Sequence, residues 1–181
     1  MLKKIVLIGP ESTGKTTLVG QLAQHFNTVY CPEYLRLYLD EKEKYGWQNE
    51  GELVAKSDLK PLAIGQMNLE NQLAQFANGI LFCDTNLLTN QIYAQYYLND
   101  ATPWLDKAIE GQNYGFYLLL TPEVAWIADS QRDSPQTQQE LYAHFKKAVE
   151  LQKKPYSIID GKDYQKRFQK AMKEVEVFLR E

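Results

Sequence analysis

GPESTGKTT, residues 9–17, follows a short apolar run and precedes a stretch in which apolar residues recur at helical spacing. It matches the pattern G-x-x-x-x-G-K-[ST] through Gly9, Gly14, Lys15 and Thr16. A strand before the pattern and a helix after it form the context that the pattern requires. This combination favours a phosphate-binding loop over a glycine-rich turn that binds nothing.

Each part of this loop has a predicted role in holding a nucleoside triphosphate. The glycines let the backbone turn its N–H groups toward phosphate oxygens, and the following helix adds the positive end of its dipole. Lys15 is expected to reach the β- and γ-phosphates, and the Thr16 hydroxyl to ligate Mg²⁺. The predicted cofactors are therefore ATP and Mg²⁺. The residues expected to bind the nucleotide are Gly9, Pro10, Glu11, Ser12, Thr13, Gly14, Lys15, Thr16 and Thr17.

Five short apolar runs predict the strands of one sheet. Their apolar character is continuous rather than alternating, which is typical of parallel strands covered on both faces. Helical segments separate the runs, so the pattern predicts a three-layer α/β fold with its ligand edge at the carboxyl ends of the strands. The runs are residues 5–8, 28–31, 80–83, 116–120 and 156–159, and the predicted helices are residues 17–26, 58–76, 87–97, 137–152 and 164–179.

Length, charge and cysteine usage indicate a single domain that binds small molecules. A chain of 181 residues can bury one sizeable core, and no linker-like stretch divides it, so residues 1–181 are expected to form one domain. The formal net charge of −3 argues against nucleic acid or a membrane surface as a partner. The first apolar run is too short for a signal sequence or a membrane span. Cys31 and Cys83 favour buried free thiols in a reducing cytoplasm.

Two acidic residues are predicted at the ligand edge. Asp84 ends the third run, where a carboxylate faces the metal beside Thr16, although Asp also favours the N-cap of the helix that follows. Glu33 follows the second run, together with Tyr34 and Arg36. An acid at this position accepts the proton of a substrate hydroxyl, and an arginine binds phosphate. The alternative for these three residues is the solvated start of a helix.

Three further segments contain candidates for which the sequence leaves two readings open. Asp58 and Gln66 surround a helix start, where spacing alone favours a capping role. The polar segment 125–136 contains Arg132, which suits either a lid that closes over phosphates or an ordinary surface loop. Trp104 offers a flat ring suited to stacking in a pocket, although such rings are more often core residues.

Four stretches together resemble the ribosylnicotinamide kinase domain of NadR-type proteins and the related AAA-like P-loop ATPases: GPESTGKTTL, CPEYLR, ILFCDTNLLTNQIYAQYY and YLLLTPEVAWIADSQRD. The phosphate loop is common to many families. The more specific features are Glu-Tyr-x-Arg after the second run, Cys-Asp-Thr after the third and Arg-Asp after the fourth. The resemblance covers nearly the whole chain, and it implies a fold similar to nucleoside and nucleotide kinases, with a five-stranded parallel sheet of order 2-3-1-4-5.

The resemblance also implies an activity, the transfer of the γ-phosphate of ATP to the 5′-hydroxyl of nicotinamide riboside. In this reading Lys15, Glu33, Asp84 and Arg132 are catalytic, with Glu33 favoured as the base. Thr16 and Asp84 are the predicted ligands of the metal. The resemblance makes Glu33, Asp84, Tyr34, Arg36, Asp58 and Gln66 candidates for the substrate pocket. Trp104, a candidate for stacking, completes the predicted substrate-binding residues.

Two alternatives to this activity remain open. The first is a kinase for another nucleoside or a hydroxylated metabolite, because pocket shape decides which acceptor binds. The second is a regulatory ATP- or GTP-binding switch. Against a GTPase, the sequence contains no Asn-Lys-x-Asp motif for reading guanine, and Asp84 is followed by Thr-Asn-Leu rather than by Asp-x-x-Gly.

Overall fold

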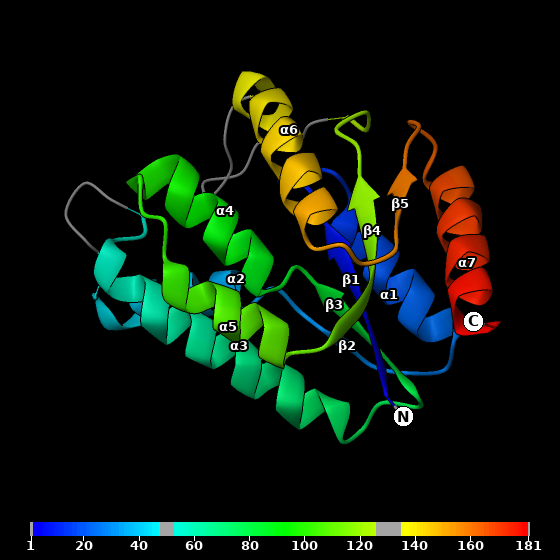
Figure 1. Ribbon diagram of the computed structural model, residues 1–181, viewed down its shortest axis with the longest axis horizontal. Helices are drawn as coiled ribbons and strands as arrows, with labels where there is room; N and C mark the ends of the chain where they lie inside the picture. The colour runs from blue at the N-terminus through cyan, green and yellow to red at the C-terminus, as the bar shows by residue number, and fades with distance from the viewer. Residues whose placement is uncertain (1, 48–52, 126–134, 181) are drawn as a thin grey trace.

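A five-stranded parallel sheet is the centre of the computed structural model, which describes residues 2–47, 53–125 and 135–180 (Figure 1). The strand order is β2-β3-β1-β4-β5, and all neighbouring strands are parallel. This order confirms the predicted 2-3-1-4-5 sheet. The strands are β1 (Lys3–Ile8), β2 (Tyr30–Cys31), β3 (Ile80–Asp84), β4 (Tyr114–Leu120) and β5 (Tyr156–Ile159).

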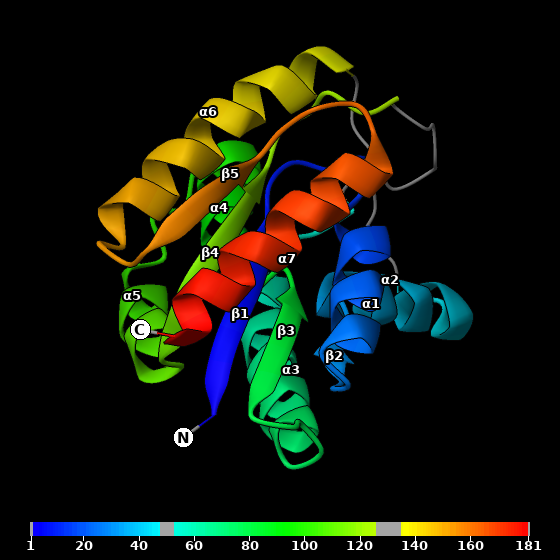
Figure 2. The same cartoon turned by 90° about the vertical axis from the view of Figure 1, so that its right-hand side faces the viewer.

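Helices cover both faces of the sheet and make the fold three-layered. They are α1 (Lys15–His25), α2 (Tyr34–Tyr45), the 3-10 helix η1 (Lys56–Asp58), α3 (Leu59–Ala74), α4 (Leu87–Leu98), α5 (Pro103–Gly111), α6 (Pro135–Leu151) and α7 (Tyr164–Arg180). One core contains residues of α3 to α6, and a second core contains residues of α1 and α7 (Figure 2). Along β1, Val6 and Ile8 belong to the first core, whereas Ile5 and Leu7 belong to the second. This double covering explains why the strand sequences are continuously apolar.

The helix α5, the 3-10 helix η1 and the strand β2 differ from the elements expected from the sequence. The helix α5 was not predicted, although Pro103 occupies its first turn, a position where the missing N–H of proline costs nothing. The strand β2 is shorter than the apolar run 28–31. At Thr28 the side-chain hydroxyl, rather than a backbone N–H, donates to the Ile80 carbonyl oxygen of β3, at 2.6 Å. The backbone pairing of β2 with β3 is therefore limited to Tyr30 and Cys31.

Two expectations about the environment of the chain can be compared with the structure. Cys31 and Cys83 are buried free thiols, as predicted, and they occupy paired positions on β2 and β3. No helix within the described ranges combines the length and the apolar character that crossing a membrane requires.

Strand register brings the candidate residues to one edge of the sheet. Leu7 pairs with Asp84, so the loop that follows β1 lies beside the acid that ends β3. Cys31 pairs with Cys83, which places the start of α2 at the same edge. Because all the strands are parallel, the segments that follow them meet where ligands bind in open α/β sheets.

A buried polar network lies at the opposite end of the sheet. The Lys4 ammonium group donates to Glu70 Oε2 at 3.0 Å and to Gln112 Oε1 at 2.8 Å. Gln66 Nε2 and the Tyr114 hydroxyl both donate to Glu70 Oε1 at 2.9 Å. The Glu70 carboxylate is completely buried and receives all three donors, so it joins β1, β4 and α3.

Replacing Glu70 by Ala is expected to lower the free energy of unfolding by about 3–5 kcal/mol, because the Lys4 charge stays buried without its counter-ion. Urea denaturation followed by circular dichroism measures this change. Glu110→Ala, at an exposed position of α5, is the control and is expected to change stability by about 0.5 kcal/mol or less. Equal stability of the two variants would contradict a structural role for this network.

Candidate active site

The loop of residues 9–17 joins β1 to α1, and both the backbone angles and the surrounding atoms favour glycine at positions 9 and 14. Gly9 has φ 145° and Gly14 has φ 82°, values that favour glycine. A Cβ atom on Gly9 would lie 2.7 Å from the Leu120 carbonyl oxygen. One on Gly14 would lie 2.9 Å from a ring carbon of Tyr164. Any other residue at these two positions would force the loop to change shape.

Lys15 lies at the first position of α1 with its ammonium group inside the loop. The side chain is buried, with 7% of the residue exposed. Its Nζ atom donates to the carbonyl oxygens of Gly9, at 2.9 Å, and of Pro10, at 2.7 Å. A lysine ammonium group has three donors, so one more is available to an incoming phosphate oxygen. The predicted role of Lys15 therefore fits its position.

Asp84 and Thr16 meet at the N-terminus of α1. The Thr16 hydroxyl donates to Asp84 Oδ2 at 2.6 Å, and Asp84 is 1% exposed. The other carboxylate oxygen, Oδ1, is buried without a hydrogen-bond partner among the described residues. A hard cation would satisfy this oxygen, and Mg²⁺ prefers oxygen ligands such as these. The two residues therefore fit the predicted magnesium site.

The donor set indicates how Mg²⁺ would be held. Among the described residues there is no group of three or more His, Cys, Asp and Glu side chains suited to a metal ion. Mg²⁺ is usually bound through one or two carboxylates, with substrate phosphates and water as its remaining ligands. A site with Thr16 and a single carboxylate, beside a phosphate loop, matches that usage.

Glu33 and Arg36 face the phosphate loop from the start of α2. Arg36 Nε lies 3.3 Å from Glu33 Oε2, and the Glu33 side chain is 13% exposed. Burial raises the pKa of the Glu33 carboxyl, while the nearby Lys15 charge opposes this shift. Burial likewise raises the pKa of Asp84, against Lys15 and the hydrogen bond from Thr16. Two carboxyl groups with raised pKa values thus lie close to one lysine.

Lys15, Glu33 and Arg36 line a polar pocket of about 120 Å³. Its walls come from the phosphate loop, the start of α2, the segment after β4 and the start of α7. The lining residues are Glu11, Ser12, Thr13, Gly14, Lys15, Thr16, Thr17, Glu33, Arg36, Ala125 and Tyr164. Positive side chains and the N-terminus of a helix converge here, which is suited to an anion such as a polyphosphate.

A second, largely apolar pocket of about 340 Å³ shares Glu11 with the first. It is formed by residues of α2, α3 and α4 and by the segment before η1. Its volume is within the range of small-molecule sites, about 300–1,000 Å³. The lining residues are Glu11, Leu35, Leu53, Val54, Leu59, Leu62, Asn90, Tyr93, Ala94, Tyr97 and Leu98.

The structure brings four of the predicted residues together at the phosphate loop: Lys15, Glu33, Arg36 and Asp84. Three others contact protein groups. Gln66 Oε1 accepts from the Tyr34 N–H at 3.2 Å, and a Cβ atom on Gly65 would overlap the Tyr34 ring, so this ring lies directly against α3. Trp104 packs against the first core from α5.

Asp58 connects α2 to the segment before α3. Its carboxylate accepts from the Tyr38 hydroxyl at 2.7 Å, the Lys42 ammonium group at 2.8 Å and the Ala55 N–H at 2.9 Å. The bond from Ala55 caps the start of η1, whereas the Asp58 side chain makes no capping hydrogen bond to α3, the helix that its spacing was expected to cap. Substrate contacts of Tyr34, Asp58, Gln66 and Trp104 stay predictions. Arg132 lies outside the described residues.

Sequence reasoning missed Tyr164 in the polar pocket and the face of α4 in the apolar one. On α4, Asn90, Tyr93, Ala94 and Tyr97 recur at the three- and four-residue spacing of one helix face. A core-facing surface has the same spacing, so the sequence pattern did not separate a pocket wall from ordinary packing.

A parallel sheet of this order, with a phosphate loop after β1 and a carboxylate at the end of β3, defines a P-loop protein with the fold of nucleoside and nucleotide kinases. The chain belongs to the AAA domain family AAA_28, whose model matches residues 4–167.

Comparison with known proteins confirms the resemblance to NadR. The trifunctional NAD biosynthesis/regulator protein NadR of Salmonella typhimurium is 29% identical over 132 residues, which cover 72% of this chain and 31% of that protein. The NadR protein of Escherichia coli is 26% identical over 183 residues, which cover 99% of this chain and 43% of that protein. The chain thus spans less than half the length of the curated relatives it matches.

Solved structures confirm the fold. NadR in complex with NR has a TM-score of 0.75 at 22% identity, covering 98% of this chain and 49% of that chain. NadR in complex with NAD and AMP-PNP has a TM-score of 0.74 at 23% identity, with the same coverage. Thymidylate kinase from Candida albicans has a TM-score of 0.65 at 14% identity, covering 97% of this chain and 92% of that chain.

Proposed function

We propose that this chain is an ATP-dependent kinase that phosphorylates the 5′-hydroxyl of nicotinamide riboside, giving nicotinamide mononucleotide and ADP. The observation that carries the proposal is that Glu33 and Asp84 both lie at the phosphate loop, next to an apolar pocket that shares Glu11 with the polar one. The solved NadR complexes with NR and with AMP-PNP support the choice of acceptor and of ATP as donor.

The chain's own groups account for binding and charge stabilisation. The loop N–H groups and Lys15 would bind the phosphates, and Thr16 and Asp84 would hold Mg²⁺. Mg²⁺, when bound there, would neutralise negative charge on the phosphate oxygens. Because phosphoryl transfer needs positioning and electrostatic stabilisation above all, these groups supply most of what the reaction requires.

Glu33 is the proposed base, and the geometry around each acid supports this assignment. Asp84 Oδ2 is engaged by the Thr16 hydroxyl, which suits a carboxylate that holds a metal. Glu33 lies beside Arg36 at the polar pocket, and 13% of its side chain is exposed. The acceptor oxygen forms the new bond to the γ-phosphorus, and the bond to the β–γ bridging oxygen breaks. Glu33 takes the proton of the acceptor hydroxyl, and ADP leaves.

The test is ADP release from Mg-ATP, measured with a coupled assay in the presence and absence of nicotinamide riboside. Adenosine, uridine and deoxynucleosides serve as parallel acceptors. Stimulation by nicotinamide riboside alone would support the proposal. Stimulation by another nucleoside would support the kinase activity but assign a different acceptor. Tight GTP binding without any acceptor-dependent ADP release would favour a nucleotide-binding switch instead.

Filling the apolar pocket is expected to weaken acceptor binding selectively. Ala94 lines this pocket on α4 and is nearly completely buried, so Ala94→Leu places a larger side chain in the cavity. We expect the KM for the acceptor to rise about tenfold or more, and the KM for ATP to change by less than about twofold. Gln95→Leu, at the exposed neighbouring position, is the matched control. An unchanged acceptor KM in Ala94→Leu would place the acceptor elsewhere.

A further inference from the structure

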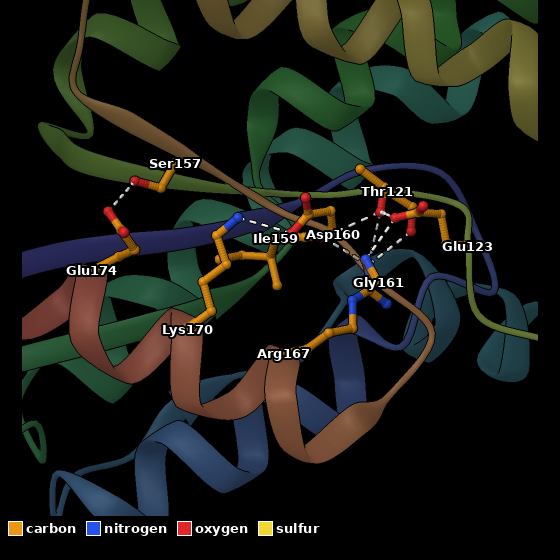
Figure 3. Close-up of polar contacts among 9 residues, drawn as sticks. All are labelled: Thr121, Glu123, Ser157, Ile159, Asp160, Gly161, Arg167, Lys170 and Glu174. Carbon is orange, nitrogen blue, oxygen red and sulfur yellow. Dashed lines mark hydrogen bonds and ion pairs between the residues drawn. The ribbon is translucent and has the colours of Figure 1, made fainter.

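The guanidinium group of Arg167 lies beneath the phosphate loop and binds three backbone carbonyl groups. Nη1 donates to the Thr13 oxygen at 2.7 Å, and Nη2 donates to the Thr121 and Ile159 oxygens at 2.8 Å each. Figure 3 shows Arg167 reaching from α7 to Thr121, which follows β4, and to Ile159, the last residue of β5. One side chain therefore joins the phosphate loop to the ends of two strands.

Arg167 is 2% exposed, and none of its hydrogen bonds within the described residues goes to a carboxylate. The nearby acids have other partners (Figure 3): Glu123 accepts from the Gly161 N–H and the Thr121 hydroxyl, and Asp160 pairs with Lys170. A buried charge is costly unless it is hydrogen-bonded. Backbone carbonyl oxygens accept from both Nη atoms, whereas Nε is buried without a hydrogen-bond partner among the described residues. The positive charge therefore lies against the Thr13 carbonyl group of the phosphate loop.

A second donor holds the loop from the other side. Gln138 of α6 is 5% exposed, and its Nε2 atom donates to the Glu11 carbonyl oxygen at 2.6 Å. Arg167 and Gln138 come from different helices that lie far from the loop in sequence. Together they bind two carbonyl groups, those of Glu11 and Thr13, that are separated by a single residue.

Peptide geometry connects these contacts to phosphate binding. In a trans peptide the C=O and N–H groups point in opposite directions, and no described peptide bond is cis. The Glu11 carbonyl shares its peptide with the Ser12 N–H, and the Thr13 carbonyl shares its peptide with the Gly14 N–H. Donors that hold the two carbonyls on the outside of the loop therefore turn these two N–H groups toward its interior.

We infer that Arg167 and Gln138 are positioning residues, which preorganise the phosphate loop by fixing the Gly14 and Ser12 N–H groups toward the nucleotide phosphates. The inference rests on the proposed function, because it requires a nucleotide at this loop. Neither residue is among the described residues that line the polar or the apolar pocket. They hold the loop in its binding conformation, so nucleotide binding does not have to order it. Losing either residue therefore weakens nucleotide binding more than acceptor binding.

The test compares Arg167→Lys and Gln138→Met with two controls at exposed positions of the same helices, Lys173→Met and Gln139→Met. Lysine keeps the charge of Arg167 but loses the planar fork that reaches several carbonyls. Isothermal titration with AMP-PNP and Mg²⁺ measures nucleotide binding, and steady-state kinetics give the KM of each substrate.

Each positioning variant is expected to weaken AMP-PNP binding and raise the KM for ATP by about three- to tenfold, the effect of losing one hydrogen bond or more. The KM for the acceptor is expected to stay within about twofold. A general structural defect would instead lower the thermal midpoint and affect both substrates alike. Gln138→Met loses a single hydrogen bond and remains informative if Arg167→Lys does not fold.

The outcomes separate this inference from the proposed function. Failure of the wild-type chain to bind AMP-PNP would overturn the proposed function and the inference with it. Normal wild-type binding, together with an unchanged ATP KM in Gln138→Met and in any folded Arg167 variant, would overturn the inference alone. Equal rises in the KM of both substrates would assign these residues a structural role and would likewise overturn it.

Discussion

Replacing Lys15 by Ala is expected to lower turnover by about 10²–10³-fold while the chain stays folded. The Lys15 side chain is buried and lines the polar pocket, and its charge opposes the rise in the pKa of the Glu33 and Asp84 carboxyl groups. In a site of low dielectric, a charge fixed before the reaction stabilises developing negative charge without reorganisation. Alanine removes this fixed positive charge, so the developing negative charge loses its stabilisation.

The fold is expected to tolerate this change because the Lys15 ammonium group bonds only to loop carbonyls, those of Gly9 and Pro10, in the described contacts. The coupled ADP assay gives kcat, and the thermal midpoint by circular dichroism tests folding. Lys44→Ala, at an exposed position near the end of α2, is the control and should match the wild type in both measurements. Near-normal turnover in Lys15→Ala would exclude phosphoryl transfer at this loop.

The features that the sequence predicted well are set by local patterns. The glycines at 9 and 14, with a strand before them and a helix after them, define the loop whatever the rest of the chain does. The strand order was obtained from the family resemblance, and the continuous apolar runs agree with strands covered on both faces. Asp84 was also placed correctly, because a residue that ends a buried strand of a parallel sheet must lie at the ligand edge.

The features that were missed depend on contacts between distant residues. Arg167 meets Thr13 across 154 positions, and Gln138 meets Glu11 across 127. In the sequence both appear as ordinary polar residues of amphipathic helices. Gln66, a predicted substrate-binding residue, contacts the Tyr34 N–H and the Glu70 carboxylate. These contacts depend on the packing of α3 beside the start of α2, which the sequence does not show.

Substitution of the two acids is expected to separate the metal ligand from the base. Glu33→Gln should lower kcat by about 10²–10⁴-fold, because glutamine cannot accept the proton of the acceptor hydroxyl. Its requirement for Mg²⁺ should stay close to that of the wild type. Asp84→Asn should raise the Mg²⁺ concentration for half-maximal rate by about tenfold or more, because a neutral amide replaces the anionic oxygen ligand.

The measurement is the initial rate as a function of Mg²⁺ at saturating ATP, with Asp106→Asn on α5 as a control at an exposed position. Since Asp84 is held by the Thr16 hydroxyl, Thr16→Val should move the Mg²⁺ dependence in the same direction as Asp84→Asn. In the reverse pattern, Glu33→Gln shifts the Mg²⁺ curve and Asp84→Asn lowers only kcat. This result would make Glu33 the metal ligand and Asp84 the base. A shift in both curves would mean that Glu33 and Asp84 hold the metal together, and that the acceptor loses its proton to another group.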